Sequence, residues 1–189
     1  MWDQPSDPAD PQAVAQVLDR VAEARPRCGS VRVVALDGRS GSGKTTLARA
    51  VAAALPAPVV HMDRLYPGWD GLAASVPILV SEVLDPLADG ASPAYRVWDW
   101  HRDRWNGREH LTHAPVVVVE GCGSSVGPAG AYAAVRVWME APRAERLRRG
   151  LARDGETYRP HWERWAAQED RLYAVDGTRA KADLVIRTG

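Results

Sequence analysis

The sequence predicts an α/β fold in which a parallel five-stranded sheet carries helices on both faces. Short, almost wholly apolar runs alternate along the chain with longer segments whose apolar residues recur at helical spacing. The runs lack the in-out alternation of strands that have one solvated face, so they are typical of buried parallel strands. The five expected strands are residues 31–36, 59–62, 116–119, 135–139 and 184–186.

The helices are expected between these strands. Residues 1–11, rich in proline and aspartate, predict a loose lead-in, and apolar residues at helical spacing from Ala13 to Val21 then indicate a first amphipathic helix. A second helix covers residues 46–55 and stops at Pro56, because proline does not continue a helix. Later helices are expected within residues 72–87, 143–153 and 161–175.

Length and composition bound the class of protein. At 189 residues the chain fits a single domain, 1–189, and its 46% hydrophobic and 25% charged residues are typical of a folded globular protein. The formal net charge is 0, which gives no global attraction to nucleic acid or to an anionic membrane. No apolar run approaches the roughly 20 residues of a spanning helix, and the start does not resemble a secretory signal. We therefore expect a cytoplasmic protein without a nucleic-acid or membrane partner.

A phosphate-binding motif lies between the first strand and the second helix. The pattern G-x-x-x-x-G-K-[ST] is met without a mismatch, and the strand-loop-helix setting is the context that the motif requires. Its glycines allow a concave nest of backbone N–H groups, which would close around phosphate oxygens at the positive end of the helix. The expected cofactor-binding residues here are Gly38, Arg39, Ser40, Gly41, Ser42, Gly43, Lys44, Thr45 and Thr46.

Two residues of this motif predict ATP and Mg²⁺ as cofactors. Lys44 would reach the β- and γ-phosphates, and Thr45 would place its hydroxyl on Mg²⁺. Lys44 is also one of only two lysines in a chain that otherwise takes its positive charge from arginine. The alternative is a turn rich in glycine and serine that binds no ligand, and the complete motif argues against it. The sheet is then expected to be of the P-loop NTPase type.

Two acidic residues follow strands that should end at the same edge as this loop. Asp63 comes after the strand of residues 59–62, and Glu120 directly follows the strand of residues 116–119. In open α/β sheets, ligands bind outside the carboxyl ends of the strands. Asp63 would accept the proton of a substrate hydroxyl, and Glu120 would orient Mg²⁺ or its waters. The alternatives are a helix cap or solvated loop aspartate at Asp63 and a surface glutamate at Glu120.

An arginine-rich helix is expected over residues 143–153. Arg146, Arg149 and Arg153 are spaced i, i+3 and i+7, which places them on one face. Guanidinium groups bind phosphate oxygens through two N–H groups and stabilise charge on a transferring phosphoryl group, so this face would meet polyphosphate. The alternative is a solvated basic face near the helix C-terminus, which the helix dipole favours.

Taken in chain order, these motifs resemble the uridine kinase and phosphoribulokinase group of P-loop kinases. The resemblance covers about residues 31–186 and is carried by the phosphate loop, Asp63-Arg64-Leu65-Tyr66, Trp98-Asp99-Trp100, Glu120-Gly121 and the spacing of Arg146, Arg149 and Arg153-Asp154. It implies that Asp63 is the general base, that Tyr66 and Asp99 line the acceptor site, and that Glu120 assists Mg²⁺. It also implies that the three arginines sit on a small helical lid over ATP, within about residues 143–175.

The acceptor region departs from the family pattern. The histidine that nucleoside kinases of the group carry shortly after the triplet is Asp103 here, while His101 follows Trp100 directly. The segment also holds three of the eight tryptophans of a chain without phenylalanine. Such rings could stack on a nucleobase, or tryptophan could replace phenylalanine in packing. The expected acceptor residues are Asp63, Tyr66, Trp98, Asp99 and Arg104.

The favoured function is ATP-dependent phosphoryl transfer to a hydroxyl of a small molecule, with a nucleoside or nucleotide as the expected acceptor. The expected catalytic residues are Lys44, Asp63, Arg149 and Arg153, with Arg146 on the nucleotide and Thr45 and Glu120 on the metal. Two rivals stay open, a kinase of a different small metabolite and a nucleotide-binding ATPase or switch. Against the switch, the chain has no Asn-Lys-x-Asp guanine motif, and one small domain carries both a candidate base and an expected lid.

Overall fold

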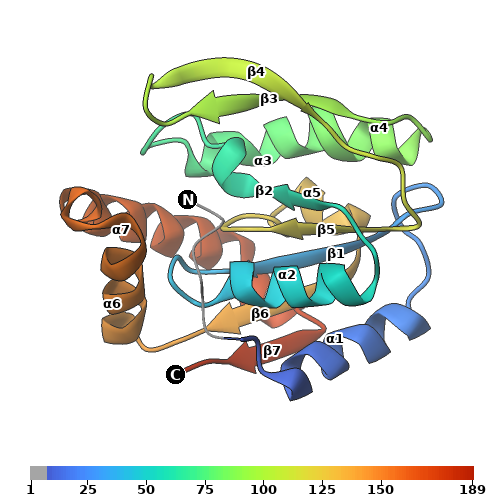
Figure 1. Cartoon of the computed structure of the whole chain (residues 1–189), viewed down its shortest axis with the longest axis horizontal. Helices are drawn as coiled ribbons and strands as arrows, with labels where there is room; N and C mark the ends of the chain where they lie inside the picture. Colours follow the sequence, from blue (N-terminus) through green and yellow to red (C-terminus); the bar gives the residue numbers. More distant parts are fainter. Residues whose placement is uncertain (1–7) are drawn as a thin grey trace.

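A computed structural model describes residues 8–189, and its centre is a five-stranded parallel sheet (Figure 1). β1 (Arg32–Gly38) is the middle strand and pairs with β5 (Val116–Glu120) on one side and β6 (Ala133–Glu140) on the other. β2 (Val59–His61) and β7 (Leu184–Arg187) form the edges, which gives the order β2-β5-β1-β6-β7. The predicted α/β class and the five parallel strands are confirmed.

The sheet separates two hydrophobic layers. Because side chains alternate along a strand, Val34 and Leu36 of β1 face one layer, whereas Val33 faces the other. β5 behaves in the same way, with Val118 in the first layer and Val117 in the second. Both faces of these strands are buried, which is why each reads as a continuous apolar run.

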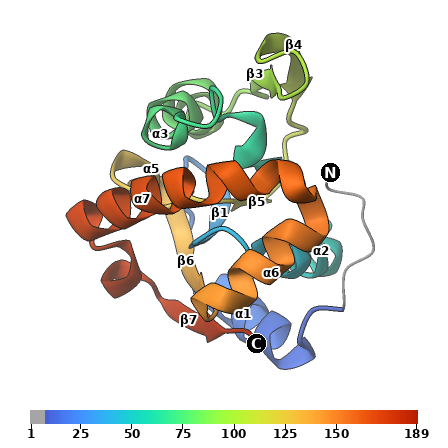
Figure 2. The same cartoon turned by 90° about the vertical axis from the view of Figure 1, so that its left-hand side faces the viewer.

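Helices cover both faces, as the sequence predicts. α1 (Pro11–Glu23) and α2 (Lys44–Ala54) pack on the layer that contains Leu36. The other layer is covered by α3 (Leu72–Leu79), a π-helical turn (Val80–Leu84), α4 (Asp85–Ala88), α5 (Pro128–Tyr132) and α7 (Arg159–Asp176). α6 (Arg143–Asp154) precedes α7, and the two lie beside the phosphate loop (Figure 2). Within residues 8–189, no helix is both long enough and apolar enough to cross a membrane.

The first helix begins inside the expected lead-in. Pro11 is already helical, and Asp10 caps the helix by accepting a hydrogen bond of 2.9 Å from the backbone N–H of Gln12. Within the described part of the chain, only residues 8–10 of the expected lead-in precede the helix. The rest of the predicted lead-in, residues 1–7, lies outside the described residues.

A hairpin occupies the polar, tryptophan-rich stretch, for which the sequence predicted no strand. β3 (Ala94–Asp99) and β4 (Arg104–His110) pair antiparallel and lie over α3, apart from the main sheet (Figure 1). Only one face of the hairpin is buried, through Tyr95 and Val97 of β3. The alternation of buried and exposed residues is short and lies in a stretch rich in charged residues, so the sequence indicated a loop here.

Candidate active site

The phosphate loop between β1 and α2 is packed tightly against its neighbours. Gly38 and Gly41 have positive φ angles of 139° and 79°. A Cβ added at Gly38 would come within 2.2 Å of the Met139 carbonyl oxygen, and one at Gly41 within 2.3 Å of the Arg146 carbonyl oxygen. Both positions therefore require glycine, and they bring the loop into contact with β6 and α6.

The residues of the motif divide into two groups around a cleft. Those that line it are Ser40, Gly41, Gly43, Lys44, Thr45 and Thr46. Arg39 turns away instead, and its guanidinium forms an ion pair of 2.5 Å with Asp170 of α7. Ser42 is fully buried. Gly38, Arg39 and Ser42 were predicted to bind phosphate through the loop backbone, and none of the three lines the cleft.

A buried carboxylate holds this loop in place. Asp37 Oδ1 accepts hydrogen bonds from the N–H groups of Gly38 (2.7 Å) and Gly123 (2.9 Å) and from the Tyr173 hydroxyl (2.7 Å). Asp37 Oδ2 accepts two more from the N–H and hydroxyl of Ser125, at 2.8 and 2.9 Å. With its hydrogen-bonding capacity met, the buried charge is tolerated and ties the loop to α7 and to the segment after β5.

Lys44 is positioned as a phosphate-binding lysine. Its side chain is buried at the start of α2, and Nζ donates a 2.9 Å hydrogen bond to the carbonyl oxygen of Arg39 across the loop. Burial works to lower the pKa of this ammonium, but its neighbours, Cys122 first and then Glu120 and Glu169, raise it above its ordinary value. Lys44 therefore stays charged at neutral pH.

Thr45 and Glu120 form a pair of oxygen ligands beside Lys44. The Thr45 hydroxyl lies 3.3 Å from both carboxylate oxygens of Glu120, and His61 Nδ1 lies 2.6 Å from Oε1 of the same residue. Mg²⁺ on a nucleotide takes one or two protein oxygens together with phosphates and waters, and this pair fits that requirement. No group of three or more His, Cys, Asp or Glu residues in the described chain could hold a metal by itself.

Asp63 lies at the carboxyl end of β2, in the short 3-10 turn Met62–Arg64. It lines the same cleft as Lys44 and Glu120. Burial raises the pKa of the Asp63 carboxyl to about 6, while the nearby Arg153 guanidinium works in the opposite direction. A carboxylate with this pKa is ionised at neutral pH and is basic enough to accept a proton from an alcohol that is being phosphorylated.

The three arginines of α6 that were predicted to meet polyphosphate differ in what they contact. Arg149 and Arg153 line the cleft, and Arg153 forms a two-point ion pair with Asp154 at 2.6 and 2.9 Å. Arg146 does not line it. Its side chain is buried and donates to the carbonyl oxygens of Ala141 and Ser40, both at 3.2 Å. The geometry thus favours bracing of the loop over direct ATP contact for Arg146.

Aromatic rings form the wall of the cleft next to Asp63. Trp69 stacks on His161 with ring centres 4.2 Å apart and meets Trp100 edge-on at 5.0 Å. The indole N–H of Trp100 donates a 2.8 Å hydrogen bond to the backbone carbonyl of Asp63. The wall is completed by Tyr66, His101, Tyr158 and Trp165, and the whole cleft has a volume of about 1040 Å³. We refer to these seven ring-bearing residues as the aromatic wall.

Three of the expected acceptor residues lie outside the cleft. Asp99 accepts hydrogen bonds from the N–H groups of His101 (3.0 Å) and Arg102 (3.1 Å) and so closes the turn of the hairpin. Trp98 packs edge-on against Trp105, and Arg104 is exposed. Of the five expected acceptor residues, the cleft brings together Asp63 and Tyr66, and the tryptophan that faces it from this segment is Trp100.

Sequence reasoning did not single out several residues of the site. Trp69 and His161 come from separate segments, and no local spacing joins them to each other or to Trp100, which the family resemblance did indicate. Glu169, which contacts the loop behind the cleft, is fully buried in α7. Its i, i+4 spacing to Trp165 was the one available signal, because it puts both side chains on one helix face.

Solved structures with the same fold include proteins described as kinases. A possible uridine kinase from Bacillus stearothermophilus matches with a TM-score of 0.69 and 18% sequence identity, covering 93% of this chain and 97% of the other. A candidate fructose transport system kinase from Silicibacter sp. TM1040 matches with a TM-score of 0.56 and 25% identity, covering 94% and 100%. No family model and no curated protein sequence matches the chain. The chain therefore has the fold of solved structures described as kinases, which agrees with the P-loop kinase fold that the sequence motifs predicted.

Proposed function

We propose that this protein transfers the γ-phosphoryl group of ATP to a hydroxyl of a small neutral molecule, with a nucleoside as the favoured acceptor. One observation carries the proposal: Lys44, the Thr45–Glu120 pair and Asp63 all line a single cleft. A phosphate-binding cation, a pair of metal ligands and a base are the parts that in-line phosphoryl transfer needs.

Each residue has a part in this reaction. Lys44 and the loop N–H groups would hold the phosphates, and Thr45 and Glu120 would hold Mg²⁺, which when bound would supply neutralisation of phosphate charge. Asp63 accepts the proton of the acceptor hydroxyl as that oxygen attacks phosphorus. Arg149 and Arg153 of α6 stabilise the charge of the transferring group.

The acceptor side supports a neutral molecule with a flat face. Its lining comes from the segment after β2, the hairpin turn and the start of α7, and it contains the aromatic wall and Asp63. Among the described lining residues, the lysine and arginines come only from α2, α6 and β7. A phosphate on the acceptor would therefore find no lysine or arginine from the elements that form this side, whereas a ring would find aromatic faces.

The test is ADP release in a coupled assay with matched acceptors: nucleosides, the corresponding nucleotides, hexoses and hexose phosphates. We expect neutral nucleosides to raise ADP release above the acceptor-free rate, and phosphorylated acceptors to leave it unchanged. If only hexoses stimulate ADP release, the acceptor is a sugar and not a nucleoside. ATP hydrolysis that no acceptor stimulates would overturn the kinase proposal in favour of an ATPase.

A further inference from the structure

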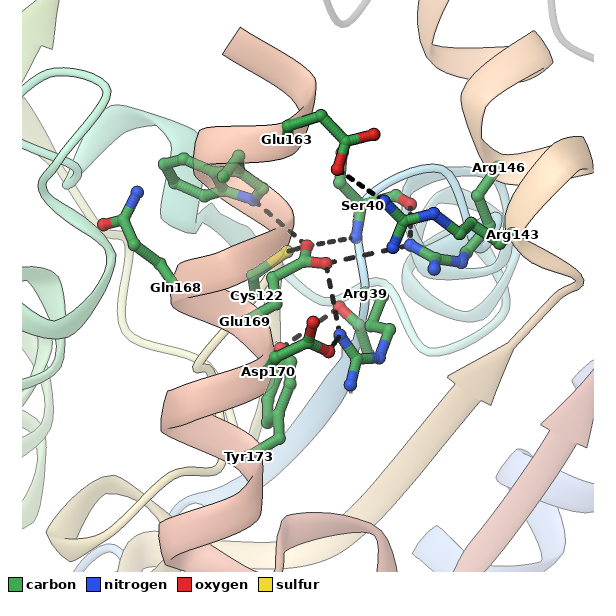
Figure 3. A network of polar contacts seen from close by, with 12 residues as sticks. Arg39, Ser40, Cys122, Arg143, Arg146, Glu163, Gln168, Glu169, Asp170 and Tyr173 are labelled. Carbon is green, nitrogen blue, oxygen red and sulfur yellow. Dashed lines mark hydrogen bonds and ion pairs between the residues drawn. The ribbon is translucent and has the colours of Figure 1, made fainter.

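Glu169 is a buried carboxylate behind the cleft that contacts both the phosphate loop and the aromatic wall (Figure 3). It lies in the middle of α7. Its Oε1 atom accepts a 2.6 Å hydrogen bond from the backbone N–H of Ser40 and a 3.1 Å hydrogen bond from the indole N–H of Trp165. One oxygen atom thus joins a peptide of the loop to a ring that lines the cleft.

The second oxygen of Glu169 is balanced by charge. Oε2 lies 3.8 Å from an Nη1 nitrogen of Arg39 and 3.7 Å from that of Arg146, without a hydrogen bond within the described chain. Arg146 also donates to the carbonyl oxygen of Ser40 at 3.2 Å. The backbone N–H of Ser40 is therefore held by α7 and its backbone carbonyl by α6. Removing this carboxylate would leave Arg146 with a buried, less compensated charge.

The Ser40 side chain adds a third attachment. Its hydroxyl lies 2.8 Å from the Tyr158 hydroxyl, and Tyr158 belongs to the aromatic wall. A peptide whose N–H points at Glu169 cannot point at a phosphate. Its orientation instead fixes the start of the turn that would present the N–H groups of Gly41, Gly43, Lys44 and Thr45 to a nucleotide, while the N–H of Ser42 donates to the Arg39 carbonyl at 3.2 Å.

We propose that Glu169 is a positioning residue that sets the phosphate loop at Ser40 and couples it, through Trp165, to the acceptor side of the cleft. The term "acceptor side" rests on the proposed function, whereas the contact between Glu169 and the phosphate loop does not depend on it. The Trp165 ring meets Tyr66 edge-on at 4.9 Å, so a change in the wall is transmitted to the carboxylate oxygen that holds Ser40.

The first experiment measures Mg²⁺-AMP-PNP affinity by titration calorimetry. Glu169→Leu removes the acceptor of the Ser40 hydrogen bond, and we expect it to weaken binding by about 10–100-fold, the range for a lost charge-assisted hydrogen bond. Glu169→Gln keeps a carbonyl oxygen for Ser40 and should weaken binding much less. Asp170→Asn is the matched control, because Asp170 pairs with the same Arg39 but does not contact Ser40. It should bind the nucleotide like the wild type.

The second experiment follows the two groups that Glu169 joins. In ¹⁵N-labelled protein, with Trp165→Phe used to assign the indole signal, we expect the Trp165 N–H resonance to shift when Mg²⁺-AMP-PNP binds. The shift should disappear in Glu169→Leu. The Ser40 amide should exchange slowly in the nucleotide-free wild type and in Glu169→Gln, and quickly in Glu169→Leu.

The outcomes separate positioning from folding and from the proposed function. A Glu169→Leu protein with a native circular dichroism spectrum and unchanged nucleotide affinity would overturn the proposal, as would equal losses in Glu169→Leu and Asp170→Asn. If Glu169→Leu does not fold, the Glu169→Gln variant decides. An indole shift like that of the wild type together with slow exchange of the Ser40 amide in Glu169→Gln supports the positioning role, and rapid exchange of that amide opposes it. A wild type that shows these signals but phosphorylates no acceptor would refute the kinase and keep the positioning role.

Discussion

The phosphate side and the acceptor side of the cleft are built in different ways. The phosphate side is one continuous stretch, residues 38–46, whose backbone between β1 and α2 forms the loop. The acceptor side is assembled from Tyr66 and Trp69 after β2, Trp100 in the hairpin turn, and His161 and Trp165 in α7. A site made by local backbone geometry can be located by a motif, whereas a site made by tertiary packing of side chains cannot.

The largest effect is expected at the point where the phosphate side holds charge. Lys44→Ala should abolish turnover and weaken Mg²⁺-ATP binding by at least about 100-fold, because the ammonium that meets the β- and γ-phosphates is lost. Calorimetry and the ADP-release assay measure the two effects. Lys181→Ala, the only other lysine in the sequence, removes an exposed ion pair with Asp176 and serves as the control. Equal affinity in wild type and Lys44→Ala would refute the phosphate site.

Asp63→Asn should separate the two sides of the cleft. We expect kcat to fall by roughly 10²–10⁴-fold, the range for losing a general base, while the Kd of Mg²⁺-ATP changes little. Steady-state kinetics with the identified acceptor and calorimetry with ATP give the two numbers. Asp183→Asn, at the edge of the sheet, is the matched substitution, since Asp183 caps the backbone N–H of Arg136 far from the cleft. Normal kcat in Asp63→Asn would reduce Asp63 to a structural residue.

The acceptor side should respond to the loss of a ring. Trp69→Leu removes an indole of the aromatic wall that stacks on His161, and we expect the KM of the acceptor to rise about 2–10-fold with the KM of ATP nearly unchanged. Trp105→Leu is the control, because Trp105 packs against Trp98 within the hairpin and does not line the cleft. Equal changes in both KM values would mean that Trp69 supports the whole fold.

Asp99 was predicted to line the acceptor site but lies outside the cleft, so its substitution tests the same part of the molecule from the other direction. The family resemblance predicts that Asp99→Ala raises the acceptor KM, whereas its hydrogen bonds in the hairpin turn predict a smaller change than that of Trp69→Leu. The comparison of the two variants in one kinetic series decides between these predictions. A larger rise in Asp99→Ala would return Asp99 to the acceptor site and imply that the turn rearranges when the acceptor binds.

The sheet could be predicted because burial on both faces leaves a signal in each strand. The run of four valines before Glu120 indicates a central strand, and β5 lies between β1 and β2. The hairpin could not be predicted, since only Tyr95 and Val97 of β3 are buried and the charged Arg96 stands between them. The hairpin packs instead on the turn Met62–Arg64 and on the π-helical turn Val80–Leu84, contacts that no local pattern shows.

The same division holds within the site. Asp63 and Glu120 lie at the ends of β2 and β5, and Lys44 and Thr45 begin α2 after the loop that follows β1, so the topology of the sheet brings all four together. Arg146 is on the predicted helix, but whether it points at a nucleotide or at the Ser40 carbonyl depends on how α6 packs on the loop. Glu169 shows the limit most clearly, because only the folded structure places a residue of α7 against Ser40.

The smallest expected effect concerns stability, and it again arises at Asp63. The folded protein raises the pKa of this carboxyl from 3.8 to about 6, so above pH 6 the fold carries a charge that its surroundings disfavour. Asp63→Asn should therefore stabilise the protein at pH 8 by about 1–3 kcal/mol, or roughly 2–4 °C in Tm for each kcal/mol. Thermal unfolding of both proteins across pH measures the difference.

The pH dependence gives this prediction its control. As the pH falls through about 6 toward 4, the folded wild type takes up the proton before the unfolded chain does, so its stability approaches that of Asp63→Asn. Over the same interval kcat should fall, because a protonated Asp63 cannot accept the acceptor's proton. Stability and activity then change in opposite directions with pH. A stability difference between the two proteins that stays constant from pH 8 to pH 4.5 would show that the charge of Asp63 is not what the fold disfavours.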